Sequence, residues 1–385
     1  MSDIKRKACI VGIYEYPLRK CPDQSIWQLH ADVADGALKD AGLSWEDVDG
    51  YFCGGDAPGG AMAMAEYLGL TNQLTHYDTT DTGGSSYVMH VGKMAEAIVM
   101  GKCKVALCTL AGKPRTAPPT PRVPGFEQGF ETGYNGSPPN LYALAARRHM
   151  HEYGTTSEQL AWIKVAASQH AQYNPHAMLQ DVVTVEDVVN SPMIADPLHM
   201  FDCCVVSEGG GAFIMTTPEI AKSLGKPIVN VLSAAQFLKG QAGGKDMDLT
   251  TSGLAVSGPK TLELAGVTTA DIKYASIYDS FTITVLMQIE DMGFCKKGEG
   301  GKFVMDGNLI SGVGKLPFNT DGGGLCNNHP VNRGGMTKVL EAVRQLRGEA
   351  HPKVQVPNCD IALVTGIGGT LTVRHGSAAA VLERG

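Results

Sequence analysis

Long apolar runs and clusters of basic residues are both missing from this 385-residue chain. No stretch approaches the roughly 18 consecutive apolar residues that a membrane-spanning helix needs. The net charge is −7 and the Lys and Arg residues are scattered, whereas nucleic-acid surfaces cluster them to neutralise phosphates. We therefore expect no membrane span and no nucleic-acid partner. The 18% charged and 43% apolar residues predict a folded chain whose partners are small molecules or proteins.

Cysteine is sparse, with ten residues in the chain and no Cys-x-x-Cys pair. A disulfide scaffold needs a much denser set, and a structural zinc site needs closely paired thiolates. The apolar stretch within residues 1–13 is too short for a secretory signal. These features predict a reduced, cytoplasmic protein without a bound metal.

Several nucleotide and hydrolase motifs are also absent. The chain has neither a Gly-x-Ser-x-Gly elbow nor a phosphate-binding loop ending in Gly-Lys-Ser or Gly-Lys-Thr. The glycine-rich segment 366–369 is followed by strand-like residues 370–373, where a dinucleotide fingerprint requires a helix. His149 and His151 are two residues apart and would lie on different faces of a helix, which disfavours a shared metal.

What the chain does contain is a repeat. Residues 41–48 close an amphipathic helix and lead into an apolar strand, and residues 265–272 have the same pattern. A second pair follows at residues 103–107 and 359–363, where a cysteine and a charged residue open an apolar strand. Two helix–strand units repeated in order predict two copies of one α/β fold, with a site shared between them.

The alternation of strands and helices suggests the domain boundaries. It stops after residue 112, where seven prolines between positions 114 and 139 precede two predicted helices. We interpret this region as an insertion. The predicted parts are a first half at 1–112, an inserted cap or loop region at 113–202, a return of the first half at 203–225 and a second half at 226–385.

Capping residues predict where the repeated helices begin and end. Ser25 is expected to cap a helix that Gly42 ends. Pro259 is expected in the first turn of the matching helix, because a proline there costs no hydrogen bond. The second copy of the helix should therefore be shorter than the first.

Polar and glycine residues gather in three segments at expected strand ends or helix starts, where α/β sheets collect their ligands. These are residues 79–86, 278–281 and 322–330. In the first, glycines allow close backbone approach and the following helix directs free N–H groups at any anion. It is equally compatible with a plain strand-to-helix turn. A tyrosine at a strand end and a lone histidine are also commonly structural.

These segments, the repeat and the insertion resemble the thiolase superfamily, in particular the branch allied to sterol-carrier-protein-associated thiolases. The resemblance extends over essentially the whole chain and is strongest at residues 278–281, 286–301 and 328–348. It implies a duplicated α/β/α/β/α five-layer fold with an inserted cap. It also implies an acyl-CoA substrate, with coenzyme A as part of that substrate and no tightly bound cofactor.

Both cysteines of a thiolase are missing here. The nucleophilic cysteine that the resemblance places before the first-half glycines falls on Thr80, and the second cysteine falls on Gly366. A threonine hydroxyl has neither the low pKa nor the soft sulfur of a thiolate. A Claisen condensation through an acyl-cysteine is therefore not expected.

The remaining site residues resemble those of the steroid side-chain aldolases, a branch that also lacks the nucleophilic cysteine. Their tyrosine falls on Tyr278 and the histidine of the thiolase oxyanion site falls on His329, so we expect both to be catalytic. The aldolases carry a second tyrosine in the loop that spans residues 328–333 here, and this chain has none. The other expected pocket residues are Thr80, Asp81, Gly83, Gly84, Ser85, Asp279, Cys326, Asn328 and Gly366.

Three functions are compatible with these residues. The first is a lyase that cleaves a β-hydroxyacyl-CoA by retro-aldol chemistry, in which Tyr278 takes the β-hydroxyl proton and His329 helps to hold the enolate oxygen. The second is an acyltransferase that works without a cysteine intermediate, or with Cys326 as its nucleophile. The third is a non-catalytic subunit that binds acyl-CoA or lipid.

The resemblance also implies protein partners. Thiolase-like folds usually form homodimers in which an edge strand of the first half pairs across a two-fold axis. Cysteine-less relatives often act with a small protein made of an OB-fold and a zinc ribbon, which would give a heterotetramer. The insertion at 113–202 is expected to shape the acyl pocket and to help hold coenzyme A.

Overall fold

The helix end that the repeat predicts occurs in both halves of the computed structural model. Helix α1 (Ile26–Ala41) ends at Gly42 and helix α9 (Leu254–Ala265) ends at Gly266. The two glycines have φ angles of 74° and 71°, which residues with a Cβ rarely adopt. The described residues are 3–117, 137–239, 248–330, 334–369 and 375–385.

Among the described residues, nine strands form one sheet in the order β3-β2-β4-β7-β1-β8-β11-β10-β9. The first half supplies its first five strands and the second half supplies the rest. Their bounds are β1 (Cys9–Glu15), β2 (Gly50–Gly54), β3 (His76–Thr80), β4 (Val105–Gly112), β7 (Gly209–Thr216), β8 (Val229–Lys239), β9 (Tyr274–Ser276), β10 (Ile361–Gly368) and β11 (His375–Arg384).

The sheet contains one four-strand pattern twice. In the first half, β2 pairs with β4 in parallel, and β4, β7 and β1 then pair antiparallel in that order. In the second half, β9, β10, β11 and β8 repeat these pairings. The two half-sheets join where β1 pairs with β8. This topology confirms the predicted duplication.

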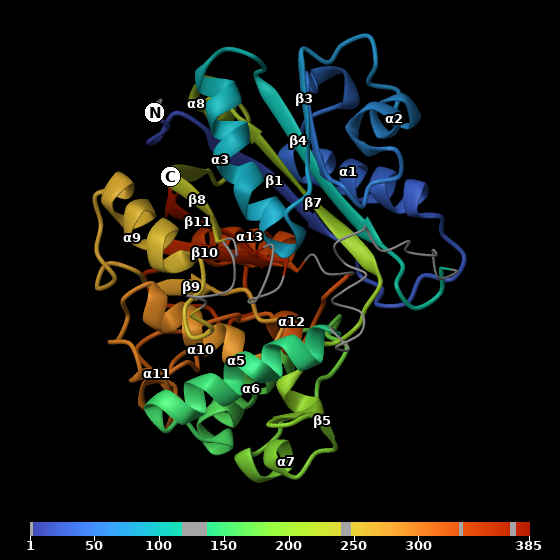
Figure 1. Cartoon of the computed structure of the whole chain (residues 1–385). Coiled ribbons are helices and arrows are strands. Elements are labelled where there is room, and N and C mark those ends of the chain that lie inside the picture. The colour runs from blue at the N-terminus through green and yellow to red at the C-terminus, as the bar shows by residue number, and fades with distance from the viewer. Residues whose placement is uncertain (1–2, 118–136, 240–247, 331–333, 370–374) are drawn as a thin grey trace.

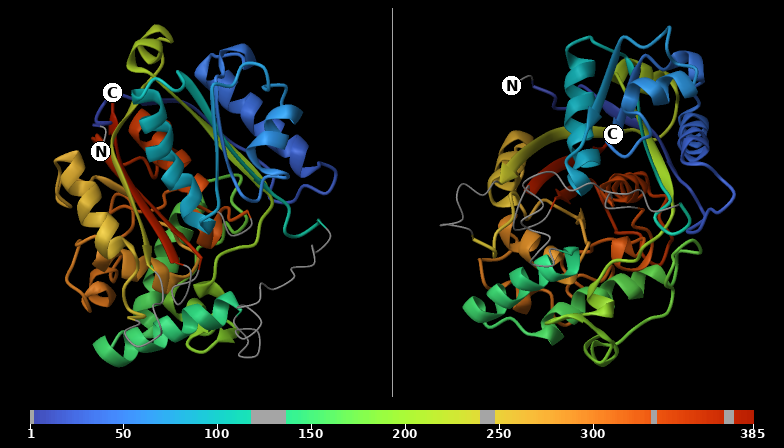
Figure 2. Two further views of the ribbon diagram at one scale, coloured as in Figure 1. Left: turned by 45° about the horizontal axis from the view of Figure 1, so that its top comes forward. Right: turned by 45° about the vertical axis from the view of Figure 1, so that its right-hand side comes forward.

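Five layers result from the way the helices cover the two half-sheets. Helices α3 (Ser86–Val99) and α13 (Gly335–Arg347) lie between the half-sheets and share one hydrophobic core with both (Figure 1). Helices α1 and α2 (Gly60–Tyr67) cover the outer side of the first half-sheet, and α9 covers the second (Figure 2). The expected α/β/α/β/α arrangement is therefore present.

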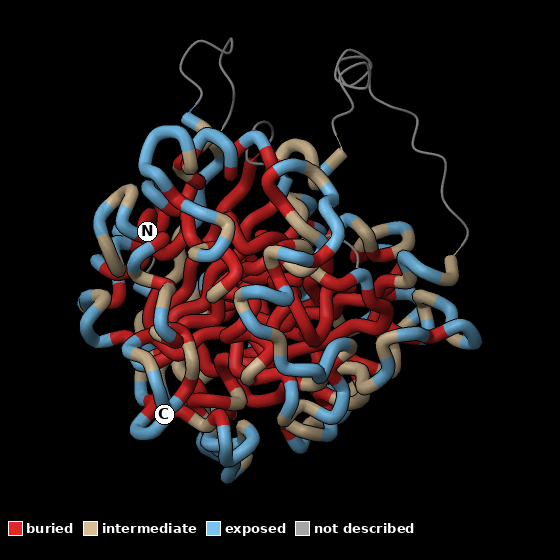
Figure 3. Tube along the Cα trace, turned by 90° about the horizontal axis from the view of Figure 1, so that it is seen from below, coloured by how far each residue is buried: buried red, intermediate tan, exposed pale blue. Residues whose placement is uncertain are grey.

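The inserted region folds beside the second half. Its helices α5 and α6 pack against α10, and α6 also packs against α12, around a separate hydrophobic core. Buried residues fill the interior of the whole molecule, and the exposed residues lie mainly on its outer turns (Figure 3). Residues 118–136 of the predicted insertion lie outside the described part. The remaining elements are α5 (Pro138–Tyr153), α6 (Ser157–Ala171), α7 (Val185–Val189), β5 (Met193–Ala195), β6 (Leu198–His199), α8 (Pro218–Ser223), α10 (Thr282–Asp291), α11 (Gly300–Phe303) and α12 (Gly323–Cys326).

One helix differs from its prediction. Pro259 lies inside α9 rather than in its first turn, because the helix already begins at Leu254. Proline removes the hydrogen bond to the carbonyl four residues earlier, at Ala255. Ala255 is exposed, so water can serve that carbonyl and the helix tolerates the proline. No helix in the described ranges has the length and apolar character needed to cross a membrane.

Candidate active site

Tyr278 follows β9 and is held by hydrogen bonds to its backbone. Its N–H donates to Thr365 Oγ1 at 3.2 Å, and Gln288 Nε2 donates to its carbonyl at 2.5 Å. Thr365 in turn donates to Gln288 Oε1 at 2.7 Å. The tyrosine is 4% exposed. Strand β10 and helix α10 together therefore fix the position from which the phenol extends.

His329 lies against the Tyr278 phenol. Tyr278 Oη and His329 Nε2 are 3.1 Å apart, and the rings meet edge to face with centroids at 5.6 Å. A Cβ added to Gly334 or Gly324 would come within 2.8 or 3.0 Å of His329 Cδ2. The glycines are needed there because the imidazole fills that space. Residues 331–333 of the loop after His329 lie outside the described part.

Gly84 brings the first-half turn to the same point. A Cβ at this residue would lie 2.3 Å from Tyr278 Oη and 2.4 Å from the Ile367 carbonyl oxygen. On its other side, a Cβ on Gly335 would lie 2.1 Å from the Gly84 carbonyl oxygen. Gly83 just before it has a φ of 63°. The structure thus places the turn of one half against the tyrosine of the other.

Other predicted residues of this turn have their polar groups engaged elsewhere. Thr80 Oγ1 donates to Asp78 Oδ1 at 2.6 Å and accepts from Lys93 Nζ at 2.6 Å. Ser85 is fully buried and its hydroxyl donates to the Thr82 carbonyl at 2.8 Å. Asp81 is exposed. The hydroxyl groups of Thr80 and Ser85 are thus bonded within the turn and its neighbours rather than to the Tyr278–His329 pair.

Asp279 holds helix α12, which precedes His329 in the chain. Its fully buried carboxylate accepts the N–H groups of Gly324 and Leu325 at 2.9 and 3.2 Å. It also forms a 2.6 Å ion pair with Lys338 of α13, which is 1% exposed at its side chain. The carboxylate is therefore occupied in fixing α12, which leads directly into His329.

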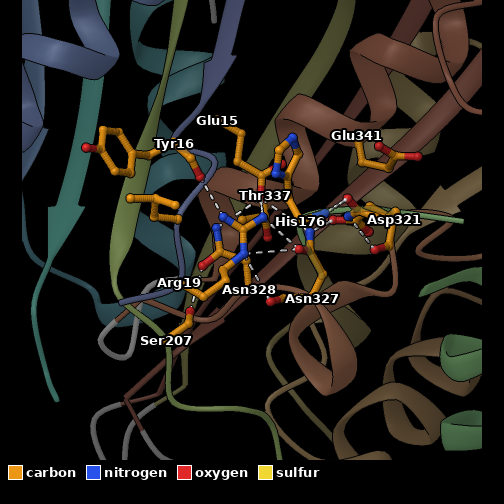
Figure 4. Close-up of polar contacts among 12 residues, drawn as sticks. Glu15, Tyr16, Arg19, His176, Ser207, Asp321, Asn327, Asn328, Thr337 and Glu341 are labelled. Atoms are coloured by element: carbon orange, nitrogen blue, oxygen red, sulfur yellow. Dashed lines mark hydrogen bonds and ion pairs between the residues drawn. The ribbon is translucent and has the colours of Figure 1, made fainter. Parts of the chain in front are cut away.

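Asn328 is buried and connects the His329 loop to two residues that sequence reasoning missed. Its Oδ1 accepts from Ser207 Oγ at 2.6 Å, and its Nδ2 donates to Glu15 Oε1 at 2.9 Å (Figure 4). Ser207 Oγ also accepts the His329 N–H at 2.8 Å. Glu15 could have been noticed in the sequence as a lone glutamate at the end of an apolar strand, whereas nothing in the sequence around Ser207 indicated a role at the site.

The surroundings of all ten cysteines disfavour the thiolate form. Burial raises the pKa of every one of these thiols above its ordinary value. Cys326, the predicted alternative nucleophile, is fully buried in α12. Reactivity requires the thiolate form. The raised pKa values therefore favour chemistry without an acyl-cysteine.

Gly366 has no room for the side chain that a thiolase carries there. It lies within β10, and a Cβ would meet Val88 Cγ2 at 2.9 Å and Ser85 Cα at 3.0 Å. The second contact is with backbone, so relief would require α3 to move. The first turn of α3 thus occupies the space that a side chain would need.

A cavity of about 330 Å³ lies between the end of β1 and helix α13. Glu15, Arg19, Asp321, Glu341 and Arg344 line it, whereas Tyr278 and His329 do not. Within the described residues, no group of three or more His, Cys, Asp or Glu side chains is arranged to hold a metal ion. The chemistry suggested by these contacts is proton transfer at the Tyr278–His329 pair.

Comparisons with known proteins identify the family and the fold. A family model described as "Thiolase C-terminal domain-like" matches residues 235–384. The chain is 32% identical over 375 residues to the acetyl-CoA acetyltransferase of Methanothermobacter thermautotrophicus, an alignment that covers 95% of this chain and 97% of the relative. It is also 32% identical over 391 residues to the steroid side-chain-cleaving aldolase of Thermomonospora curvata, with 95% and 97% covered.

A solved structure described as "Ltp2-ChsH2(DUF35) aldolase" is similar over its whole length. The TM-score is 0.90 at 31% sequence identity, and the match covers 99% of this chain and 98% of that chain. The inserted region and both halves are therefore shared with that structure.

Proposed function

Because the chain belongs to the thiolase superfamily, in its sterol-carrier-protein-associated branch near the aldolases, we propose that it cleaves a β-hydroxyacyl-CoA by retro-aldol chemistry. The products are a ketone or aldehyde and a shortened acyl-CoA. The name of the aldolase relative favours a substrate with a steroid or another bulky group. The contact between Tyr278 and His329 is the observation that carries this proposal.

Proton transfer along that contact accounts for the cleavage step. Tyr278 Oη takes the proton of the β-hydroxyl group while its own proton passes to His329 Nε2, 3.1 Å away. The alkoxide electrons form the new carbonyl, the Cα–Cβ bond breaks, and its electron pair moves into the thioester as an enolate. The imidazolium stabilises this enolate and then returns a proton to its α-carbon.

Coenzyme A enters this scheme only as the thioester part of the substrate, and no tightly bound cofactor takes part. The thiols, with their raised pKa values, also have no role in it. The thioester bond to coenzyme A therefore stays intact throughout the reaction. Gly84 at the phenol and the neighbouring turn are the first-half groups nearest to the reacting atoms.

A tyrosine substitution tests the proposal. We expect Tyr278→Phe to lower turnover of a responsive β-hydroxyacyl-CoA by roughly 10²- to 10⁴-fold, the usual contribution of a positioned acid–base group. Tyr274→Phe is the matched control, because Tyr274 is also buried and lies on the strand just before. The assay measures ketone or aldehyde together with shortened acyl-CoA. Undiminished cleavage by Tyr278→Phe would disprove the role of this residue.

Acyl transfer is a second candidate, because one relative is an acetyl-CoA acetyltransferase at 32% identity. A ping-pong acyltransferase forms a covalent acyl-enzyme. Intact-mass measurement after exposure to acyl-CoA distinguishes the two reactions, since the lyase route predicts no adduct. A non-catalytic subunit would bind acyl-CoA without releasing either product.

We also propose two protein contacts. The similar structure that combines Ltp2 with a DUF35 protein supports a partner of the DUF35 kind, which would give a heterotetramer around a homodimer. Strand β3 is an edge of the sheet and its Tyr77 is 59% exposed. We expect β3 to pair with the same strand of a second copy. Activity is therefore best measured with and without a DUF35 protein from the same source.

A further inference from the structure

A chain of hydrogen bonds connects the backbone of His329 to a carboxylate at the end of β1. The His329 N–H donates to Ser207 Oγ at 2.8 Å, and Ser207 donates to Asn328 Oδ1 at 2.6 Å. Asn328 Nδ2 then donates to Glu15 Oε1 at 2.9 Å. Ser207 and Asn328 are fully buried and the Glu15 side chain is 7% exposed. Water therefore has little access to this chain of bonds.

The direction of the two side-chain bonds in this chain follows from the charge on Glu15, whereas the His329 backbone N–H can only donate. Burial alone would raise the pKa of Glu15, but Arg19, Arg344 and Asn328 outweigh it and lower the pKa to about 2. An ionised carboxylate can only accept hydrogen bonds. Asn328 must therefore turn its NH₂ group to Glu15 and its oxygen to Ser207. The hydroxyl proton of Ser207 is then committed to Asn328, which leaves its oxygen free to accept the His329 N–H.

The carboxylate itself is rigidly held. Arg19 donates to Glu15 Oε1 and Arg344 donates to Glu15 Oε2, both at 2.8 Å. Asn327, beside Asn328, receives a further 2.8 Å bond from Arg19 to its Oδ1. These contacts fix β1, α13 and the loop before His329 to one another.

We infer that Glu15 is a positioning residue, which sets the His329 imidazole against Tyr278 by orienting Asn328 and Ser207. A misplaced catalytic group costs up to roughly 10²-fold in rate. The kinetic part of this inference rests on the proposed function, whereas the placement of the imidazole can be measured without substrate.

The kinetic test uses two single variants and their combination. Glu15→Gln can donate as well as accept, so it no longer dictates the orientation of Asn328. Ser207→Ala breaks the same chain without changing a charge. We expect each to lower kcat by roughly 10- to 100-fold with KM within about threefold. The double variant should be no slower than the slower single variant, because both act through one path. Ser207→Thr keeps the hydroxyl and should recover most of the loss.

Asp40→Asn is the matched control. Asp40 Oδ2 pairs at 2.8 Å with Arg347, another buried arginine of α13, and also accepts the N–H of Ile13 in β1. Asp40 lies in α1, and this variant removes a carboxylate that contacts β1 and α13 without touching the His329 loop. We expect it to lower the unfolding midpoint and to leave kcat unchanged.

The test without substrate is the ¹⁵N resonance of His329 Nε2 in histidine-labelled protein, assigned with His329→Asn. We expect the resonance to shift in Glu15→Gln and Ser207→Ala and to stay in place in Asp40→Asn. If no acyl-CoA is cleaved but the resonance shifts as expected, the proposed function fails and the positioning role stands. An unmoved resonance, or rate losses that multiply in the double variant, would overturn the inference. If Glu15→Gln does not fold, the resonance and kcat of Ser207→Ala still test the inference.

Discussion

Replacing Lys338 by methionine should be among the most destabilising single changes in this chain. Lys338 Nζ lies 2.6 Å from Asp279 Oδ1, and the two side chains are 1% and 0% exposed. The change leaves the Asp279 carboxylate buried beside two backbone N–H groups, from Gly324 and Leu325, without its counter-ion. Those donors supply only partial compensation for a full negative charge.

The expected loss follows from this burial. Removing one partner of a buried ion pair typically costs ~3–5 kcal/mol of unfolding free energy, because an uncompensated charge remains. Lys260 offers a comparison at the surface, since it pairs with Glu263 at 3.0 Å with side chains 41% and 69% exposed. Exposed pairs contribute ~0–1 kcal/mol. Lys338→Met should therefore exceed Lys260→Met by at least about 2 kcal/mol.

Urea unfolding of Lys338→Met, Lys260→Met, Asp279→Asn and the double variant Asp279→Asn/Lys338→Met measures these differences. Removing both charges takes away the unpaired carboxylate, so the double variant should regain ~1–3 kcal/mol over the sum of its single changes. Each variant should unfold with an unchanged dependence on urea if its fold is intact. A Lys338→Met protein within ~1 kcal/mol of wild type, or a double variant equal to the sum, would refute the reasoning.

Three further outcomes are expected. Burial and Asp321 raise the pKa of Glu341 from 4.5 to about 7. Between these two pH values, Glu341 is protonated in the folded chain and ionised in the unfolded chain. The stability of wild type relative to Glu341→Gln should thus fall by up to ~3 kcal/mol between pH 5 and pH 8 in urea unfolding; an equal pH slope in both would contradict this. Gly84→Ala should lower kcat by up to roughly 10²-fold, because its Cβ would lie 2.3 Å from Tyr278 Oη; a rate like wild type would exclude that packing. Finally, thiol alkylation at pH 7.5 should be slow and leave cleavage intact, because burial raises the pKa of all ten thiols; rapid loss of activity would point to a reactive cysteine.

Much of the fold could be predicted because its signals are local and occur twice. Gly42 and Gly266 each end a helix by adopting positive φ, a requirement that a sequence shows directly. Ser25 likewise caps α1 by accepting the N–H of Gln28. Pro259 was placed wrongly because tolerance of a proline inside a helix depends on solvent reaching one carbonyl, which the sequence does not reveal.

The site was predictable only in part. Tyr278, His329 and Gly84 come together as expected of residues at strand ends and in a glycine turn. Glu15 and Ser207 reach the His329 loop across 313 and 122 residues of sequence. Such hydrogen bonds arise from tertiary packing, which residue spacing does not encode.

The two sulfur positions of a thiolase are not merely substituted in this chain. At Gly366 a Cβ would lie 2.9 Å from Val88 Cγ2 and 3.0 Å from Ser85 Cα, so a cysteine there would press on the start of α3. At Thr80 the hydroxyl is bonded to both the Asp78 carboxylate and Lys93 Nζ, each at 2.6 Å, so this position belongs to an ion-pair network. Tyr278 Oη and His329 Nε2 nevertheless lie within hydrogen-bonding distance. The structure therefore favours thioester chemistry by proton transfer over chemistry through an acyl-cysteine.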